Sequence, residues 1–194
     1  MSTLVADRRP TLADAVARPA LLTSAAFVLA GAALTALLAQ VSIPLPFTPV
    51  PITLQTMGAL LVGSALGSRR GALSLLVYAL AGMLGAPVYA AGAGGASHVF
   101  GATGGYIVGF MAAAWVAGRL AESGWDRRWR VIFAMAAADA VIFSVGMAWL
   151  VPFVGLANVA MAGLIPFIPG EVVKIAAASG LLPLAWKAVG RKQR

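Results

Sequence analysis

Three charged residues lie inside stretches of sequence that are otherwise apolar enough to cross a membrane. Glu171 and Lys174 follow a Pro169-Gly170 pair near the C-terminal end, and Asp139 lies in the middle of an earlier apolar run. A spacing of three places Glu171 and Lys174 on one face of a helix. A lysine near the centre of a membrane helix costs about 2.5 to 3.5 kcal/mol, so such groups usually face a partner or a cavity. The sequence therefore points to a polar site within the membrane.

The Glu171 and Lys174 pair has two interpretations. An ion pair within one helix would neutralise both charges, but apolar side chains stabilise a helix as well or better, since buried pairs often fail to recover their desolvation cost. A ligand site would use the same charges, and the helix start after Pro169-Gly170 adds free N–H groups and a positive dipole end. We favour the ligand site.

Three further polar residues have both a structural and a functional interpretation. Asp139 is either a partner of Lys174, or another polar group held between helices, or a ligand contact. The Gln55 amide both donates and accepts hydrogen bonds, so it serves a ligand or helix packing. His98 is the only histidine and lies in a glycine-rich loop. We interpret it as an ordinary loop residue.

The composition is that of a membrane protein. Of the 194 residues, 61% are hydrophobic and 10% are charged, with a mean hydropathy of +0.92. A soluble domain of this length would carry about 25% charged residues. At about 20 residues per span, the length accommodates roughly six membrane helices in one unit. Cysteine is absent, so disulfides and cysteine-ligated metals are excluded.

Apolar runs separated by Pro, Gly and charged residues predict an all-α membrane protein. Proline ends such runs because it lacks an N–H and clashes with the preceding turn, and Pro152 is expected to stop the fifth helix. The six predicted helices cover about residues 21–40, 52–67, 71–84, 104–121, 131–151 and 170–189, and a short surface helix and a turn cover 153–168. The transmembrane domain, 21–190, is thus expected between a cytoplasmic tail, 1–20, and a cytoplasmic end, 191–194.

The basic residues predict the orientation of these helices. Of the 14 lysines and arginines, all except Lys174 lie in the two tails or in the loops after the second and fourth predicted helices. Positive charge collects on the cytoplasmic side, so both termini are expected inside the cell. The loops at 41–51, 86–103 and 152–168 hold no lysine or arginine and are expected to form an outer cap over a ligand pocket. Short basic clusters of this kind do not indicate nucleic-acid binding.

Small residues recur at four-residue spacing within the predicted helices. They allow close helix packing. The pairs are Ala32 with Ala36, Gly63 with Gly67, and Gly105 with Gly109. An exposed Ala32 and Ala36 face would alternatively dock another membrane subunit.

Motifs for catalysis are absent from the sequence. It contains no G-x-x-x-x-G-K-[ST] phosphate loop, no G-x-S-x-G turn and no H-E-x-x-H pair. We therefore expect a binding protein, not an enzyme, without a metal or cofactor. A channel or secondary transporter acting alone and a structural membrane subunit are the alternatives from other classes.

Several segments, taken together and in order, resemble the BioY family of biotin-binding S components of energy-coupling-factor vitamin transporters. The segments that carry the resemblance are ALLAQVSIP at 36–44, VPITLQT at 50–56, GAPVY at 85–89, GATGGYIVGF at 101–110 and PFIPGEVVK at 166–174. They are spread over about residues 30 to 180.

The resemblance implies a six-helix protein of the prokaryotic inner membrane that binds biotin from outside. It also implies a transmembrane coupling protein and ATP-binding cassette ATPases as partners. The family's acid and lysine after the Pro-Gly turn correspond to Glu171 and Lys174. This chain departs from the family pattern at four positions. The family more often has Asp where this chain has Glu171, and it usually has Pro where this chain has Ala102. Other residue types would be expected at His98 and Phe143.

Biotin chemistry fits these residues in more than one way. The ureido ring offers two N–H donors and one C=O acceptor, which suit Glu171 with Lys174, or Asp139 and Gln55. The carboxylate needs a cation or N–H donors, and Lys174 competes for that role, so the end of biotin that it contacts stays open. Another small vitamin is the alternative ligand. Aromatic walls of the kind that small-molecule sites use would come from Tyr89, Tyr106, Phe100 or Trp149.

Overall fold

The computed structural model describes residues 9–18, 20–127 and 129–192, and most of them are helical. Two very short strands, β1 (Ser42–Ile43) and β2 (Ile52–Thr53), pair antiparallel and close the proline-rich loop between them. Two 3-10 turns, η1 (Ala90–Gly92) and η2 (Ile165–Phe167), join helices. The helices are α1 (Leu12–Val16), α2 (Leu21–Ala39), α3 (Gln55–Leu66), α4 (Ser68–Met83), α5 (Ala96–Phe100), α6 (Gly104–Glu122), α7 (Arg130–Val154), α8 (Val159–Gly163) and α9 (Ile168–Lys192).

Four helical stretches are long and apolar enough to cross a membrane. They are Leu21–Ala39, Gly104–Glu122, Arg130–Val154 and Val159–Gly190. The second and third predicted helices are α3 and α4, with 12 and 16 residues. At about 1.5 Å per residue they extend only about 18 and 24 Å. The prediction of a mostly helical membrane protein is confirmed, and α3 and α4 are the short members of the bundle.

Two predicted helix ends lie elsewhere. Pro152 does not stop the fifth helix, because α7 contains it and continues to Val154. The helix ends at Gly155, whose φ of 79° lies in the left-handed region that favours glycine. The last helix begins at Ile168, two residues before the predicted start, and Pro169 is tolerated there because the N–H groups of a first helical turn have no partner within the helix.

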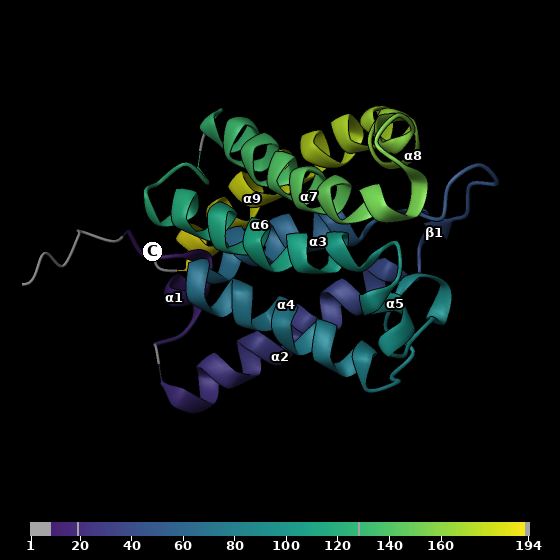
Figure 1. The fold of residues 1–194 in the computed structure, drawn as a ribbon. Helices are drawn as coiled ribbons and strands as arrows, with labels where there is room; N and C mark the ends of the chain where they lie inside the picture. The colour runs from purple at the N-terminus through teal and green to yellow at the C-terminus, as the bar shows by residue number, and fades with distance from the viewer. Residues whose placement is uncertain (1–8, 19, 128, 193–194) are drawn as a thin grey trace, which may run out of the picture.

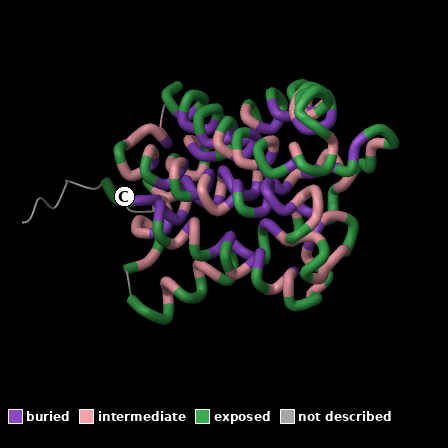
Figure 2. Tube along the Cα trace, in the orientation of Figure 1, coloured by how far each residue is buried: buried purple, intermediate pink, exposed green. Residues whose placement is uncertain are grey.

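Helix α6 packs against α3, α4 and α7, and glycines permit the close approach. A Cβ on Gly63 of α3 would lie 2.7 Å from the Ala114 Cα of α6, and one on Gly105 of α6 would lie 2.8 Å from the Trp149 Cγ of α7. Gly67 was predicted to be a helix-packing residue, but it lies between the two helices. It forms the one-residue turn from α3 to α4, with a φ of 86° that favours glycine. Figure 2 shows the buried segments along the inner faces of the helices.

Helix α2 turns its pair of small residues toward the bundle. Ala32 is buried in the hydrophobic core, and Ala36 is partly buried against it. Helix α2 packs on α4 and α3 of its own chain. This arrangement agrees with the interpretation of Ala32 and Ala36 as packing residues and not with a fully exposed face, and the docking of another membrane subunit at this pair stays a prediction.

The predicted N-terminal tail contains a short docked helix. In α1, the Thr11 side chain accepts from the Asp14 N–H, and the Asp14 carboxylate accepts from the Thr11 N–H. Arg70 of α4 holds both residues, and α1 packs on α3 and α9. In Figure 1, α1 and the C-terminal end lie at one end of the bundle, and β1, α5 and α8 lie at the other.

Candidate functional site

A cavity of about 210 Å³ lies at the β1 and α5 end of the bundle. That volume exceeds what one ion or water needs, so the cavity suits a small organic molecule. Segments far apart in sequence form its walls: the proline-rich loop with the start of α3, the glycine-rich loop, α6, α7 and the start of α9. The lining residues are Pro49, Val50, Pro51, Thr53, Gln55, Thr56, Tyr89, Ala90, His98, Thr103, Tyr106, Ile107, Phe110, Phe143, Phe167, Glu171 and Lys174.

Lys174 is the centre of a buried hydrogen-bond network in this cavity. Its Nζ donates to the Thr53 carbonyl at 2.6 Å, to Thr56 Oγ1 at 3.0 Å and to Glu171 Oε1 at 2.5 Å. Thr56 in turn donates to Glu171 Oε2 at 2.9 Å. An ammonium group has three donors, so all of them are used within the protein. The carboxylate oxygens of Glu171 retain lone pairs that can accept further hydrogen bonds.

Gln55 extends the network toward α4. Its Oε1 accepts from Thr53 Oγ1 at 2.9 Å, and its Nε2 donates to the Tyr78 hydroxyl. One of the two amide N–H donors is thus free for a ligand. The structure brings Gln55, Glu171 and Lys174 to one cavity, as the sequence analysis predicted, and adds Thr53, Thr56 and Tyr78.

Asp139 lies behind the cavity and not on its surface. The residue is buried in α7, and its Oδ1 has no hydrogen-bond partner among the described residues. It interacts electrostatically with both Glu171 and Lys174. Glu171 alone balances the charge of Lys174 in the network. The remaining lone pairs of Glu171 favour a ligand that brings hydrogen-bond donors to this wall.

Aromatic rings form the opposite wall. The Tyr106 and Phe143 rings meet edge to face at 6.0 Å between centroids, and Phe143 lies 6.0 Å from Phe167. The Tyr106 hydroxyl donates to the Gly163 carbonyl at 2.7 Å, and the Tyr89 hydroxyl donates to the Ala79 carbonyl at 2.6 Å. Burial raises the pKa of the Tyr89 hydroxyl, which keeps it neutral. Both tyrosines thus use their hydroxyls internally and offer their rings to the cavity.

Two aromatic residues proposed from the sequence lie outside the cavity. Phe100 is 68% exposed, because it ends α5 on the side that faces away from the core. Trp149 is 40% exposed and donates its Nε1–H to the Gly101 carbonyl at 3.0 Å. It packs over Gly105 on the outer side of the α6 and α7 contact. Trp149 therefore fastens the glycine-rich loop to α7.

Sequence reasoning missed His98 as a cavity residue. It lines the cavity from α5, with its ring 5.9 Å from the Tyr89 ring. Its Nδ1 is buried and has no hydrogen-bond partner within the described part of the chain. The residues from 71 to 118 contain no Asp, Glu, Lys or Arg, so His98 is the one basic side chain of that segment. A lone basic residue in an otherwise uncharged segment is the sequence signal that could have identified it.

The fold and the cavity together indicate the class of protein to which this chain belongs. Three of the four membrane-length stretches contribute residues to the cavity, which has a polar side with Glu171 and Lys174 and an aromatic side. In the described ranges, no three His, Cys, Asp or Glu residues gather closely enough to hold a metal. The class is that of helical membrane proteins that bind a small organic ligand.

The chain belongs to the BioY family, whose model matches residues 9–191. A protein described as a probable biotin transporter BioY of Pyrococcus horikoshii is 40% identical over 75% of this chain and 85% of its own. The biotin transporter BioY of Rhodobacter capsulatus is 38% identical over 69% of this chain and 77% of its own. These relatives are named as transporters, which agrees with the prediction that the chain is not an enzyme.

A solved structure has the same fold. The crystal structure of the S-component for biotin from an ECF-type ABC transporter aligns with a TM-score of 0.77 at 25% identity, over 86% of this chain and 92% of its own. The resemblance to the BioY family that the sequence segments suggested is confirmed.

Proposed function

We propose that this protein is the substrate-binding S component of an energy-coupling-factor transporter and that its cavity binds biotin. The observation that carries the proposal is the buried network of Glu171, Lys174 and Thr56 on the wall of an otherwise aromatic cavity. Relatives named as biotin transporters cover most of the chain. A fused-ring ligand with polar amide edges matches both walls.

The charges of the cavity favour one orientation of biotin. The three donors of Lys174 are already used, and Glu171 already balances its charge. This end accepts N–H donors and repels a carboxylate, so it holds the ureido ring, with Glu171 as the acceptor. The biotin carboxylate then points away from Lys174, toward the glycine-rich loop that carries His98.

The proposal includes an orientation in the membrane. Six helices, α2, α3, α4, α6, α7 and α9, cross the prokaryotic inner membrane with both termini in the cytoplasm. The distribution of basic residues supports this, since Arg69, Arg70, Arg119 and Lys187 lie at helix ends on the α1 side of the bundle. The loops at 41–51, 86–103 and 152–168 then cap the cavity on the outer face.

The protein is further proposed to work with partners. Membership of a family of ECF S components implies ATP-binding cassette ATPases and a transmembrane coupling protein as these partners, and the sequence itself contains no phosphate loop. The ECF-type transporter named for the solved neighbour supports this assignment.

A calorimetric titration of the purified full-length protein with biotin tests the proposal. Saturable binding at one site is expected, with no binding of a vitamin that lacks a ureido ring. Absence of biotin binding by folded protein would contradict the proposed function. Biotin uptake by liposomes that contain only this chain would instead support a transporter that acts alone.

A further inference from the structure

Two adjoining hollows are lined by residues of α1 and its neighbours. Helix α1 lies at the end of the bundle opposite to β1 and α5 (Figure 1). The apolar groove, of about 290 Å³, is lined by α1, α2, α3 and α9, with Phe27, Gly31 and Leu34 on the α2 side and Leu182 on the α9 side. The basic hollow, of about 410 Å³, is lined by Arg9, Arg69 and Arg70, among others. Leu66 lines both hollows.

The apolar groove lies along α3, between α2 and α9. Leu61, Val62, Ala65 and Leu66 of α3 line it, and Leu12 of α1, which packs on α3 and α9, lies at one end. None of the described residues that line the groove is charged. The α2 side chains that line it include exposed ones, such as Leu34 at 41% exposure. In a bilayer such a groove opens to the hydrocarbon, which fits an acyl chain.

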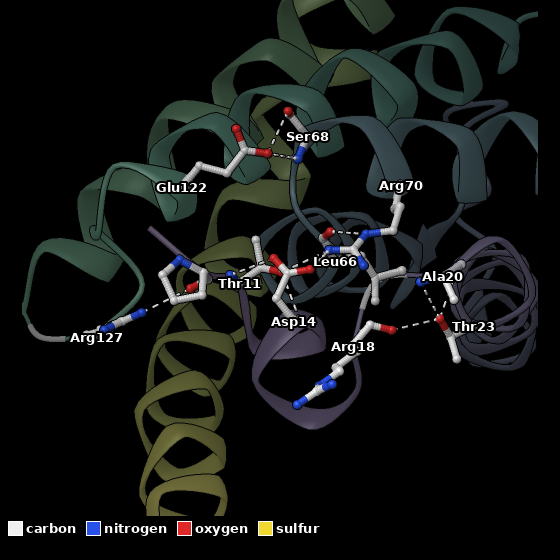
Figure 3. A network of polar contacts seen from close by, with 11 residues as sticks. Thr11, Asp14, Arg18, Ala20, Thr23, Leu66, Ser68, Arg70, Glu122 and Arg127 are labelled. Carbon is white, nitrogen blue, oxygen red and sulfur yellow. Dashed lines mark hydrogen bonds and ion pairs between the residues drawn. The ribbon is translucent and has the colours of Figure 1, made fainter. Parts of the chain in front are cut away.

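The basic hollow carries an excess of positive charge. Its two acids are already engaged: Asp14 pairs with Arg70 at 2.6 Å, and Glu122 accepts hydrogen bonds from the Ser68 N–H and hydroxyl at 2.8 Å. Figure 3 shows this network around Arg70. Arg69 is exposed and makes no ion pair in the part of the chain that the structure describes. Its guanidinium group is available to an anion.

One face of α2 connects the two hollows. Ser24 lines the basic hollow and Phe27 lines the groove, one helical turn further along. A single molecule that occupies both must therefore have an anionic head and an apolar tail. We propose that an anionic phospholipid binds here, with its phosphate at Arg69 and the basic hollow and one acyl chain in the groove. Basic pockets between membrane helices commonly bind such head groups.

Native mass spectrometry and thermal unfolding of the full-length protein in detergent test the site. Phosphatidylglycerol is expected to bind at least tenfold more tightly than phosphatidylcholine and to raise the melting temperature more. The substitution Arg69→Gln should reduce phosphatidylglycerol affinity about tenfold, because it removes a charge-assisted hydrogen bond. Filling the groove with Ala30→Phe should reduce it as well.

The matched control is Lys187→Gln, which removes an exposed positive charge at the same end of the bundle but outside both hollows. It should leave lipid affinity unchanged. Three outcomes would each overturn the proposal. The first is equal binding of both lipids, and the second is an equal loss of affinity in Arg69→Gln and Lys187→Gln. The third is a rise in melting temperature with inorganic phosphate as large as that with phosphatidylglycerol. The readouts need no biotin, so the result is independent of the proposed transport function.

Discussion

Lys174 joins two segments of the chain through the three donors of its ammonium group. It links α9 to the start of α3 through the Thr53 carbonyl and Thr56, and it neutralises Glu171. A buried pair of this kind contributes little net stability, but removing one partner typically costs 3 to 5 kcal/mol. Stability alone therefore does not explain the pair, which is consistent with the ligand contact proposed for Glu171.

We predict that Lys174→Ala weakens biotin binding tenfold or more, because Glu171 loses the group that positions and neutralises it. The same variant should melt at a lower temperature. A titration and a melting curve in the same detergent measure both effects. The matched variant Thr35→Val, which alters a buried hydroxyl bonded only within α2, should leave affinity unchanged. Wild-type affinity of Lys174→Ala would remove Lys174 from the site.

His98 is expected to contact the carboxylate of biotin. The residue lines the cavity, and its buried Nδ1 has no hydrogen-bond partner in the described part of the chain. His98→Ala should therefore weaken biotin binding severalfold in a calorimetric titration. Biotin methyl ester, which has no carboxylate, should bind equally well to His98→Ala and to the wild type. Equal affinity of the two proteins for biotin itself would contradict the contact.

At the scale of elements, close contacts between helix backbones determine which glycines matter. Gly63 faces the Ala114 backbone, whereas Gly180 of α9 has open space around the position of a Cβ. Gly63→Ala should destabilise the protein by about 1 to 3 kcal/mol, because the backbone of α6 would have to move. Gly180→Ala should be neutral or stabilising, since glycine costs about 1 kcal/mol in a helix interior. Thermal unfolding of the two variants provides the comparison.

The docking of α1 should depend on pH through Asp14. Partial burial alone would raise the pKa of this carboxyl, but hydrogen bonds from Thr11 and Arg70 hold the pKa below its usual value. A lowered folded pKa contributes stability that is present above pH 4 and is lost as the pH falls through the folded value. Asp14→Asn should therefore lower the melting temperature at pH 7, and the difference from the wild type should shrink as the pH falls below 4. A constant difference across that range would contradict the assignment.

Sequence patterns predicted the membrane helices and the charged residues of the cavity, because both follow from the cost of placing polar groups in a membrane. Hydropathy and Pro or Gly breaks govern where a membrane helix runs, and a charge inside such a helix needs a partner, so Lys174 and Glu171 were evident. The sequence did not reveal α1, because a five-residue helix is held by a tertiary contact to Arg70. It also misplaced Phe100 and missed His98, since the direction of side chains on α5 depends on packing against Tyr89.

At the scale of the whole molecule, the two ends differ in chemistry. Basic side chains and the two hollows with Leu66 lie at the α1 end, and the uncharged loops and the cavity lie at the other. This division agrees with the proposed function. Biotin would be captured at the outer end, which holds the cavity, and the coupling protein and ATPases would act at the basic, cytoplasmic end. The assignment of the two ends to the two membrane faces depends on the orientation of the chain in the membrane, which can be tested directly.

The absence of cysteine makes that test simple, because any introduced cysteine is the only one. Phe47 in the proline-rich loop is 64% exposed, and Ser123 in the turn between α6 and α7 is also exposed. In intact cells, a membrane-impermeant maleimide should label Phe47→Cys, and it should label Ser123→Cys only after the cells are permeabilised. Retained biotin binding by both variants is the control for folding. The reverse labelling pattern would place the cavity on the cytoplasmic side, and capture of biotin from outside would then be excluded.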